Sequence, residues 1–283
     1  MGARLRIAFQ GEIGAYSEEA VLGLFPGAEV VPRPSFEKVF EAVESGEVDH
    51  GVVPIENSLH GSVHANYDLL REHELHITAE LHLRIRHHLL AVEGVSLTDI
   101  RHVHSHPQAL GQCRDFLKAH LPEAALVPAY DTAGAAKDIA AEQSATTAAI
   151  ASASAAREYG LSVLASGIES NPNNYTRFLA LSRDAETPPG HPADAETKTS
   201  VLYVPGHNIP GVLFKSLAVF ALRDIDLFKI ESRPLVGTPG KYIFYLDLAG
   251  STGDETVANA IGHLEEIAAF VKVLGSYPAA RIT

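Results

Sequence analysis

The order of apolar and polar positions predicts an α/β fold for the first 183 residues. Short apolar runs, such as those at 6–9, 51–55 and 176–181, are typical of buried strands. Between such runs the apolar positions recur at helical spacing, and residues 36–43 place four of them at i, i+3, i+4 and i+7. Strands that alternate with helices favour a largely parallel sheet. Residues 79–92 begin with alternating apolar positions, and we expect one longer β segment there.

The pattern changes after residue 183. Residues 184–197 are rich in proline and polar side chains, which is typical of a linker, so we place a domain boundary there. Residues 198–283 then predict a strand, a helix, two strands, a helix and a final strand, which is the ferredoxin-like βαββαβ plan. Thr252 and Glu255 have capping-box spacing before the second of these helices. Because such a small domain often covers its open sheet with a second copy, we expect a homodimer or homotetramer.

Composition narrows the class of protein. The 283 residues, 46% of them hydrophobic, are enough for more than one buried core. A net charge of −13 argues against a nucleic-acid partner but allows a locally positive site for a small anion. The single cysteine cannot form a disulfide framework, which fits a reducing compartment. No window approaches the ~20 apolar residues of a membrane span, and the apolar start is too short for a signal peptide. We therefore expect a soluble cytoplasmic protein.

Five polar clusters stand beside the predicted strands. In open α/β sheets ligands bind at the carboxyl ends of the strands. Several clusters also begin helices, where free backbone N–H groups favour an anion. Any one cluster alone is explained by capping and turn chemistry, but together they predict a cleft for a small polar, anionic ligand. The clusters are residues 11–17, 54–58, 105–108, 131–134 and 173–178.

These clusters resemble the signature motifs of prephenate dehydratases. The chain reads Pro-Ile-Glu-Asn-Ser at 54–58, Ser-His-Pro-Gln-Ala-Leu at 105–110 and Thr-Arg-Phe at 176–178. Gly-Ala-Tyr-Ser at 14–17 and Asp-Thr-Ala-Gly at 131–134 are also similar to the family's motifs. Glu-Ser-Arg-Pro at 231–234 resembles the motif of the family's ACT regulatory domain. The motifs follow the family's order over nearly the whole chain.

The resemblance implies a fold and a domain organisation. The catalytic domain, residues 1–183, would have two lobes like a type II periplasmic binding protein, with the active site between them. The chain would cross between the lobes near 77 and 167. A ferredoxin-like ACT domain would follow at 198–283. No helical N-terminal segment resembles a chorismate mutase, so we expect the single-function form.

The resemblance also implies the reaction, the conversion of prephenate to phenylpyruvate on the route to phenylalanine. This step loses CO₂ and water, is driven by aromatisation, and requires no cofactor. Because the C4 hydroxyl is a poor leaving group, a hydrogen bond or proton delivered to it lowers the barrier. The family resemblance places Thr176 near this hydroxyl as a donor. Glu56 is chemically the stronger proton source, with a structural carboxylate as the equal alternative.

The resemblance assigns further residues to the site. Asn57, Ser105 and Gln112 match family positions tied to activity or substrate binding. Arg177 is suited to clamp a substrate carboxylate, although a structural ion pair is an equal alternative. The other candidates for substrate binding, for several of which capping or turn formation is the alternative, are Tyr16, Ser17, Ser58, His106, Gln108 and Thr132.

The tail carries candidates for an effector site. ACT domains usually bind amino acids between paired copies, and phenylalanine is the expected effector, as a feedback inhibitor. The family's usual Gly-Ala-Leu-Val is Gly-Val-Leu-Phe here at 211–214, so the glycine turn is kept while two side chains are bulkier. The alternative is an ACT domain used only for dimerisation. The candidate effector-binding residues are Asn208, Pro210, Gly211, Val212, Leu213, Glu231, Ser232 and Arg233.

Two signals point away from other chemistry, and two rival functions stay open. His102, His104 and His106 alternate, but no further ligand completes a metal spacing, so we expect no metal. Cys113 lies in an apolar helical stretch and is expected in the core. The nearest rival is arogenate dehydratase, which performs the same chemistry on the aminated substrate. The second rival is an amino-acid sensor that kept the cleft without the chemistry.

Overall fold

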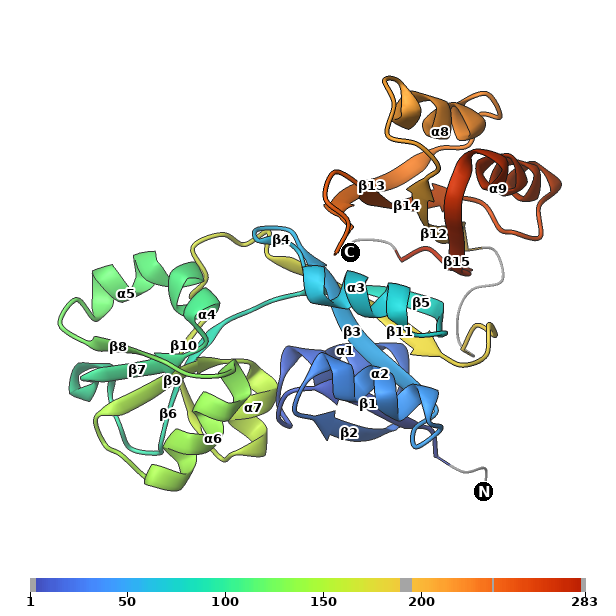
Figure 1. Ribbon diagram of the computed structural model, residues 1–283. Coiled ribbons are helices and arrows are strands. Elements are labelled where there is room, and N and C mark those ends of the chain that lie inside the picture. Colours follow the sequence, from blue (N-terminus) through green and yellow to red (C-terminus); the bar gives the residue numbers. More distant parts are fainter. Residues whose placement is uncertain (1–3, 189–194, 236, 281–283) are drawn as a thin grey trace. The chain divides into compact units, whose positions relative to one another are not determined.

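The structure, a computed structural model, describes residues 4–188, 195–235 and 237–280. These residues form two compact units, which Figure 1 shows in sequence colours. The first unit contains the residues up to Asn66 and Leu81–Phe178, and the second contains Tyr67–Glu80 and the residues from Leu179 onward. The chain passes between the units at three places, inside the helix α3 (His64–Glu72) and inside the strands β5 (His76–Arg84) and β11 (Tyr175–Ser182). Of the predicted linker, residues 189–194 lie outside the described part of the chain.

Lobe 1 of the first unit is built on a sheet in which β1 pairs in parallel with two neighbours. The strand order is β2-β1-β3-β11-β5, and the short β4 pairs with β3 (Figure 1). The centre of β1 is wholly buried because two helices pack on this sheet. These elements are β1 (Arg6–Gln10), α1 (Tyr16–Leu24), β2 (Glu29–Arg33), α2 (Phe36–Glu44), β3 (His50–Asn57) and β4 (Gly61–Ser62).

The helical face predicted over residues 36–43 is confirmed. Val39, Phe40 and Val43 of α2 are 0% exposed. Gly51 of β3 makes this packing possible, because a Cβ there would lie 2.8 Å from Cγ1 of Val39. The apolar stripe of α2 therefore closes directly on β3, the strand that carries Asn57 at its end.

Lobe 2 is built on a second sheet with the order β10-β6-β9-β7-β8. In it, β7 pairs in parallel with β8 and β9, while β6 is antiparallel to its neighbours β9 and β10. A core that includes Leu89, Val103, Leu117 and Ile150 fills one face. The elements are β6 (His88–Ala91), β7 (His102–Ser105), α4 (Pro107–Gln112), α5 (Arg114–His120), β8 (Ala125–Pro128), α6 (Thr132–Glu142), β9 (Thr147–Ala151), α7 (Ala153–Glu158) and β10 (Ser162–Ser166).

Two crossing segments join the lobes. The first is residues 85–87, between β5 and β6, so the predicted single β segment over 79–92 is wrong and the first crossing lies later than position 77. The reason lies in the backbone pairing. Ile85 N–H donates to the carbonyl of Asn174, and His87 O accepts from Ile168 N–H, so the returning chain holds this segment outside either sheet. That return, residues 167–174, is the second crossing.

The second unit contains the predicted βαββαβ order, which is confirmed. Its antiparallel sheet has the order β13-β14-β12-β15, and two helices cover one face over a core that includes Val201, Tyr203, Phe220 and Leu264. Its elements are β12 (Thr197–Pro205), α8 (Val212–Ala221), β13 (Leu227–Pro234), β14 (Tyr242–Ala249), α9 (Glu255–Ile267) and β15 (Ala268–Pro278). The capping box predicted at Thr252 is absent, because Asp254 is the N-cap and its carboxylate accepts Ser251 N–H at 2.7 Å.

The other face of this sheet meets residues 67–80 of the same unit. Tyr245 packs edge-on against Tyr67, with ring centroids 4.7 Å apart. Lys198 forms an ion pair with Glu80 at 2.7 Å, and their side chains are 9% and 0% exposed. This pair is therefore part of the interior of the second unit. Among the described helices, none combines the length and the apolar character that a membrane crossing requires.

Candidate active site

A cavity of about 600 Å³ opens between the two lobes of the first unit. Residues of both sheets and of the first crossing form its walls. Eight of the predicted substrate and catalytic residues line it, which brings together side chains from five separate stretches of the chain. These eight are Tyr16, Ser17, Asn57, His106, Gln108, Gln112, Thr132 and Thr176.

The ends of β3 and β11 bring Asn57 and Thr176 together. Backbone N–H groups of Leu59 and His60 donate to Asn57 Oδ1 at 3.0 and 3.1 Å, which fixes the orientation of the amide because these groups can only donate. Asn57 Nδ2 consequently faces Thr176 Oγ1 at 3.0 Å. Since Thr176 Oγ1 accepts this N–H, the threonine keeps its own hydroxyl proton for an acceptor in the cavity.

A second group of polar side chains crosses from lobe 1 to lobe 2. Tyr16 Oη lies 2.9 Å from His87 Nδ1, His87 Nε2 lies 2.7 Å from Gln112 Oε1, and Gln112 Nε2 lies 3.2 Å from His60 Nδ1. His60 Nδ1 is also 3.2 Å from Asn57 Oδ1. The contacts connect Tyr16 to the Asn57–Thr176 pair.

Burial sets the charge state of this group. Burial raises the pKa of the Tyr16 hydroxyl well above its usual value, and burial lowers the pKa of His87. Tyr16 is therefore a protonated donor at neutral pH, and the His87 ring is neutral there.

Sequence reasoning missed His87 and His60. His87 falls inside the alternating stretch that was predicted as one strand, and His60 lies in the turn after a motif. The only available signal for His87 was a pair of adjacent histidines within an apolar β pattern.

Two predicted residues serve the scaffold instead of the cavity wall. Ser105 is fully buried and donates through Oγ to the carbonyl of Ile150 at 2.6 Å, which ties β7 to β9. Ser58 donates to Asn173 O at 2.8 Å and accepts Tyr175 N–H at 3.0 Å, which ties the end of β3 to the chain entering β11. Their hydroxyls are engaged away from a ligand, so the expectation that they contact substrate lacks a geometric basis.

Glu56 and Arg177 also lie off the cavity. Side chains alternate along a strand, and Thr176 and Phe178 both line the cavity, so Arg177 between them points to the opposite side of β11. Arg177 is 6% exposed and takes part in an interaction. Glu56, beside Asn57, is partly buried, does not line the cavity and is likewise engaged. Neither the carboxylate clamp nor the carboxylic proton source is therefore located on this wall.

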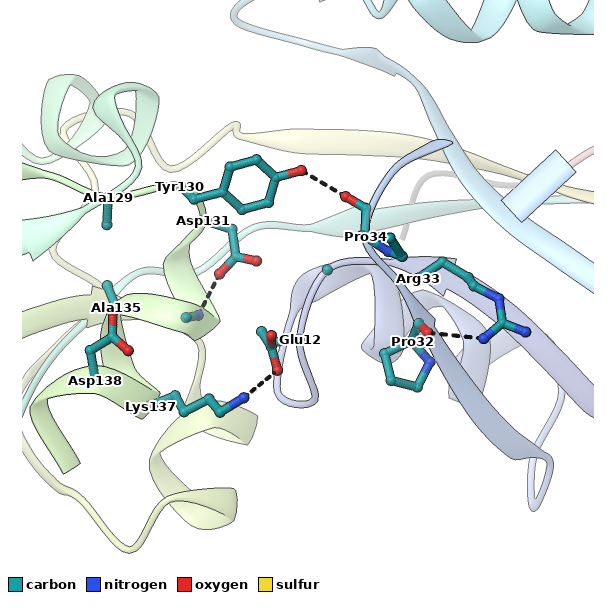
Figure 2. A pocket seen from close by; sticks show the side chains of 12 residues that line it. Glu12, Pro32, Arg33, Pro34, Ala129, Tyr130, Asp131, Ala135, Lys137 and Asp138 are labelled. Carbon is teal, nitrogen blue, oxygen red and sulfur yellow. Dashed lines mark hydrogen bonds and ion pairs between the residues drawn. The ribbon is translucent and has the colours of Figure 1, made fainter. Parts of the chain in front are cut away.

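Two contacts join the lobes at one edge of the cavity (Figure 2). Tyr130 of lobe 2 donates to the carbonyl of Pro34 at 2.8 Å. Lys137 pairs with Glu12 at 2.9 Å. A second cavity of about 520 Å³ lies between these contacts and shares Gly11, Tyr130 and Asp131 with the first. Tyr130 thus lines both cavities, a position that nothing in the sequence indicated.

Asp131 and Cys113 have structural positions. The Asp131 carboxylate accepts Gly134 N–H and caps α6, and burial raises the pKa of this carboxyl. Cys113 is 0% exposed, and burial raises the pKa of its thiol, so it is not a nucleophile at neutral pH. Within the described chain no group of three or more histidine, cysteine or acidic side chains has the arrangement of a metal site.

The predicted effector residues fall on two faces of the sheet in the second unit. Gly211 has φ +80° and is the N-cap of α8, which begins with Val212 and the 37% exposed Leu213. Residues directly opposite each other in an antiparallel pair share a face. Ser232 stands opposite Phe244 of the helix-side core, which places Ser232 on the same face as α8.

Glu231 and Arg233 lie on the opposite face. Glu231 stands across from Tyr245, and Arg233 forms an ion pair with Asp68 at 2.7 Å. Asn208, followed by Pro210 in the turn before α8, donates to the carbonyl of Gly240 at 2.9 Å. Within one copy of the chain, the eight residues therefore do not form one pocket.

Two crossing segments join the two α/β lobes around a polar cavity. This arrangement defines the class of the protein, because it is the fold of type II periplasmic binding proteins. The family model of prephenate dehydratase matches residues 7–186. The chain belongs to the prephenate dehydratase family and is a dehydratase, a carbon–oxygen lyase.

Relatives extend the similarity beyond the matched segment. Arogenate dehydratase 2 of Petunia hybrida is 50% identical over 293 residues, covering 98% of this chain and 73% of the relative. Arogenate dehydratase/prephenate dehydratase 2 of Arabidopsis thaliana, a chloroplastic protein, is 50% identical over 287 residues, covering 98% and 74%. The crystal structure of prephenate dehydratase in complex with L-Phe from Arthrobacter aurescens has a TM-score of 0.88 and 36% identity, covering 98% of this chain and 92% of that one.

Proposed function

We propose that the chain converts prephenate to phenylpyruvate in phenylalanine biosynthesis, with the conversion of arogenate to phenylalanine as the alternative. The observation that carries the proposal is the Asn57–Thr176 pair. Its amide has a fixed orientation and donates to the threonine at 3.0 Å, which leaves the threonine's own hydroxyl proton for an acceptor in the cavity. That is the donor that a departing hydroxyl requires.

In the proposed step the ring C1–carboxylate bond breaks and releases CO₂. Its electron pair moves into the ring, the C4–O bond breaks, and the leaving oxygen takes up one proton, supplied in net terms by solvent, to depart as water. Thr176 donates its hydrogen bond to this oxygen and polarises further as the oxygen gains charge, because Asn57 supports the threonine oxygen. A positioned donor of this kind contributes roughly 10²–10⁴-fold.

The anionic substrate is held without a lysine or arginine side chain among the described residues of the wall. Three helices of nine or more residues, α1, α2 and α6, begin at the cavity with Tyr16, Phe36 and Thr132. Free N–H groups at helix N-termini bind carboxylates, and the helix dipole adds to this attraction. The two carboxylates of prephenate are therefore matched by neutral donors, together with the side chains of Gln108 and Gln112.

The test is to mix purified protein with prephenate and, separately, with arogenate, and to follow the formation of phenylpyruvate and phenylalanine. Prephenate turnover well above the uncatalysed rate supports the proposal. Faster phenylalanine formation from arogenate would keep the mechanism and reverse the substrate preference. A Thr176→Ala variant with unchanged turnover would remove the threonine from the mechanism, and turnover of neither substrate by folded protein would leave the amino-acid sensor.

We also propose that the ferredoxin-like part is an ACT regulatory domain that binds phenylalanine and inhibits the enzyme. The βαββαβ order and the open turn at Gly211 support this role, as does the similarity to a dehydratase described in complex with L-Phe. Because the candidate residues lie on two faces of one sheet, we expect a second copy of the chain to complete the site.

Titration with L-phenylalanine tests the regulatory proposal, with D-phenylalanine as the control. A ligand at 100 times its Kd stabilises the state that it binds by about 2.7 kcal/mol, so inhibition should accompany a rise in the thermal unfolding midpoint. Millimolar L-phenylalanine that changes neither activity nor stability would leave the domain with a role in dimerisation only.

A further inference from the structure

The loop at residues 11–14, between β1 and α1, belongs to lobe 1 but is held by lobe 2. Tyr159, at the C-terminal end of α7, donates to the carbonyl of Ile13 at 2.7 Å. Ser152, at the other end of the same helix, donates to the carbonyl of Gly14 at 2.6 Å. The lobes are therefore connected at a third place, in addition to the two crossing segments.

The Ser152 hydroxyl is the buried centre of this connection. The residue is 1% exposed, and its Oγ accepts the N–H of Ala155 at 2.9 Å, which caps α7. Its one proton goes to the carbonyl of Gly14, a group that can only accept. Because one hydroxyl can make both bonds at once, a single side chain joins the first turn of a lobe 2 helix to the loop of lobe 1.

Gly14 approaches α7 more closely than a residue with a Cβ could. Its φ is +87°, and a Cβ there would lie 2.7 Å from Cα and 3.0 Å from Cβ of Ala155. Carbon atoms pack at about 3.5–4.0 Å, so a side chain at position 14 would separate the loop from α7 by about 1 Å. Since the nearest atom is a backbone atom, no rotamer change can relieve this contact. The contact therefore fixes the distance between the lobes on this side of the cavity.

The spacing at Gly14 affects the cavity because the substrate site is divided between the lobes. Residues 15–17 follow Gly14 directly and line the cavity. The Asn57–Thr176 pair also belongs to lobe 1, on β3 and β11. The opposite wall comes from lobe 2 and includes Gln108, Gln112 and Thr132. A substrate placed against lobe 1 reaches the lobe 2 side chains only while the distance between the lobes is kept.

We propose that Gly14 and Ser152 are positioning residues for the dehydratase reaction, which hold lobe 2 at the distance where its side chains bind a substrate placed against Thr176. This inference rests on the proposed function, since the spacing matters only for a substrate that touches both lobes. Neither Gly14 nor Ser152 lines the cavity, so both act through the position of the residues that do.

Gly14→Ala tests the spacing, with Gly27→Ala as the matched control. Both glycines have a positive φ, +87° and +83°, so the two variants carry similar backbone strain. No atom of the described residues lies within 4 Å of a Cβ at Gly27, so only G14A forces the lobes apart. A displacement of about 1 Å costs on the order of 10²-fold. G14A should lose about that factor in kcat/KM, mostly through KM because the donor pair within lobe 1 is untouched. G27A should keep the kcat/KM of the unsubstituted protein.

Ser152→Ala is a second test, which introduces no backbone strain. It removes the hydrogen bond to Gly14 and should raise KM by roughly 2- to 12-fold, the factor that corresponds to one hydrogen bond. Ser96→Ala is the control, because Ser96 is the N-cap of another lobe 2 helix, η1 (Leu97–Asp99), and its hydroxyl bonds to Thr98 and Asp99 of the same lobe. S96A should leave KM unchanged.

The split between KM and kcat separates positioning from a purely structural role. Partial unfolding lowers the amount of active enzyme, and so the apparent kcat, without raising KM. Equal losses in G14A and G27A would overturn the inference, as would a KM in S152A no higher than in S96A, which decides the question even where G14A does not fold. A crystal structure of G14A, which requires no turnover, should show α7 displaced from the loop by about 1 Å. Failure of the proposed function is distinguishable, because the unsubstituted protein would then turn over neither prephenate nor arogenate.

Discussion

Replacing Asn57 by aspartate tests the proposed Asn57–Thr176 pair most sharply, because it exchanges the side-chain amide nitrogen for an oxygen and preserves the shape of the side chain. Oδ1 keeps its two backbone N–H donors at 3.0 and 3.1 Å. The second carboxylate oxygen then replaces Nδ2, 3.0 Å from Thr176 Oγ1 and 2.9 Å from Asn174 Oδ1. Thr176 will turn its only proton to this oxygen, which removes the donor that the leaving hydroxyl requires.

The expected loss of kcat equals the rate factor that the Thr176 donor contributes. A general-acid contribution of roughly 10²–10⁴-fold corresponds to about 2.7–5.4 kcal/mol at about 1.36 kcal/mol per tenfold. The loss should fall on kcat and leave KM within a few-fold, since the hydrogen bond matters most as the C4–O bond breaks. Thr176→Val removes the same proton without adding charge and should show a similar loss.

Steady-state kinetics of N57D, T176V and the double variant measure the coupling directly. Because both single changes remove one donor, the double variant should be no slower than the slower single variant. Asn171→Asp adds the same charge at an exposed asparagine of the second crossing and serves as the control. Full kcat in N57D, or losses that multiply in the double variant, would refute the assignment of Thr176 as the donor.

Three further predictions concern stability, lobe contact and reactivity. Lys198→Met removes the cation that pairs with the fully buried carboxylate of Glu80 and should cost about 3–5 kcal/mol in urea unfolding. The loss should shrink when Glu80→Gln is added, and a loss below about 1 kcal/mol would contradict the pairing. Tyr130→Phe removes the hydrogen bond to Pro34, which is worth about 0.5–1.5 kcal/mol. The variant should raise KM by roughly 2- to 12-fold with little change in kcat. An unchanged KM would show that this hydrogen bond does not contribute to substrate binding. Cys113 should not react with a thiol-specific disulfide dye until the chain unfolds, and rapid labelling of native protein would contradict its burial.

The order of the helices and strands could be predicted from the sequence because local patterns encode it. The buried face of α2 follows from helical spacing, and the βαββαβ order follows from the sequence of apolar runs. The interruption between β5 and β6 at residues 85–87 could not be predicted from the sequence. Ile85 continues the alternation of β5, and bonds with the distant residues 168, 169 and 174 hold the chain out of the sheet there.

The residues of the site could be predicted in part from the sequence, for the same reason. Motifs mark positions that matter without distinguishing the cavity wall from its support, so Ser105 and Thr176 were predicted together although only Thr176 lines the cavity. Arg177 could have been excluded by strand alternation once Thr176 was taken as facing inward. His87 required knowledge that Tyr16 and Gln112 meet, which depends on how two sheets and two crossings are assembled.

The placement of Asn57 and Thr176 on neighbouring strands has a consequence for how this enzyme can change. Because β3 and β11 are adjacent in one sheet, the proposed donor Thr176 and its support Asn57 belong to the same sheet, whatever the second lobe does. Gln108, Gln112 and Thr132 reach the cavity from that other lobe. The proposed donor and these three side chains thus lie in separable parts of the chain. Substitutions at Gln108, Gln112 or Thr132 are therefore expected to change substrate binding more than the bond-breaking step.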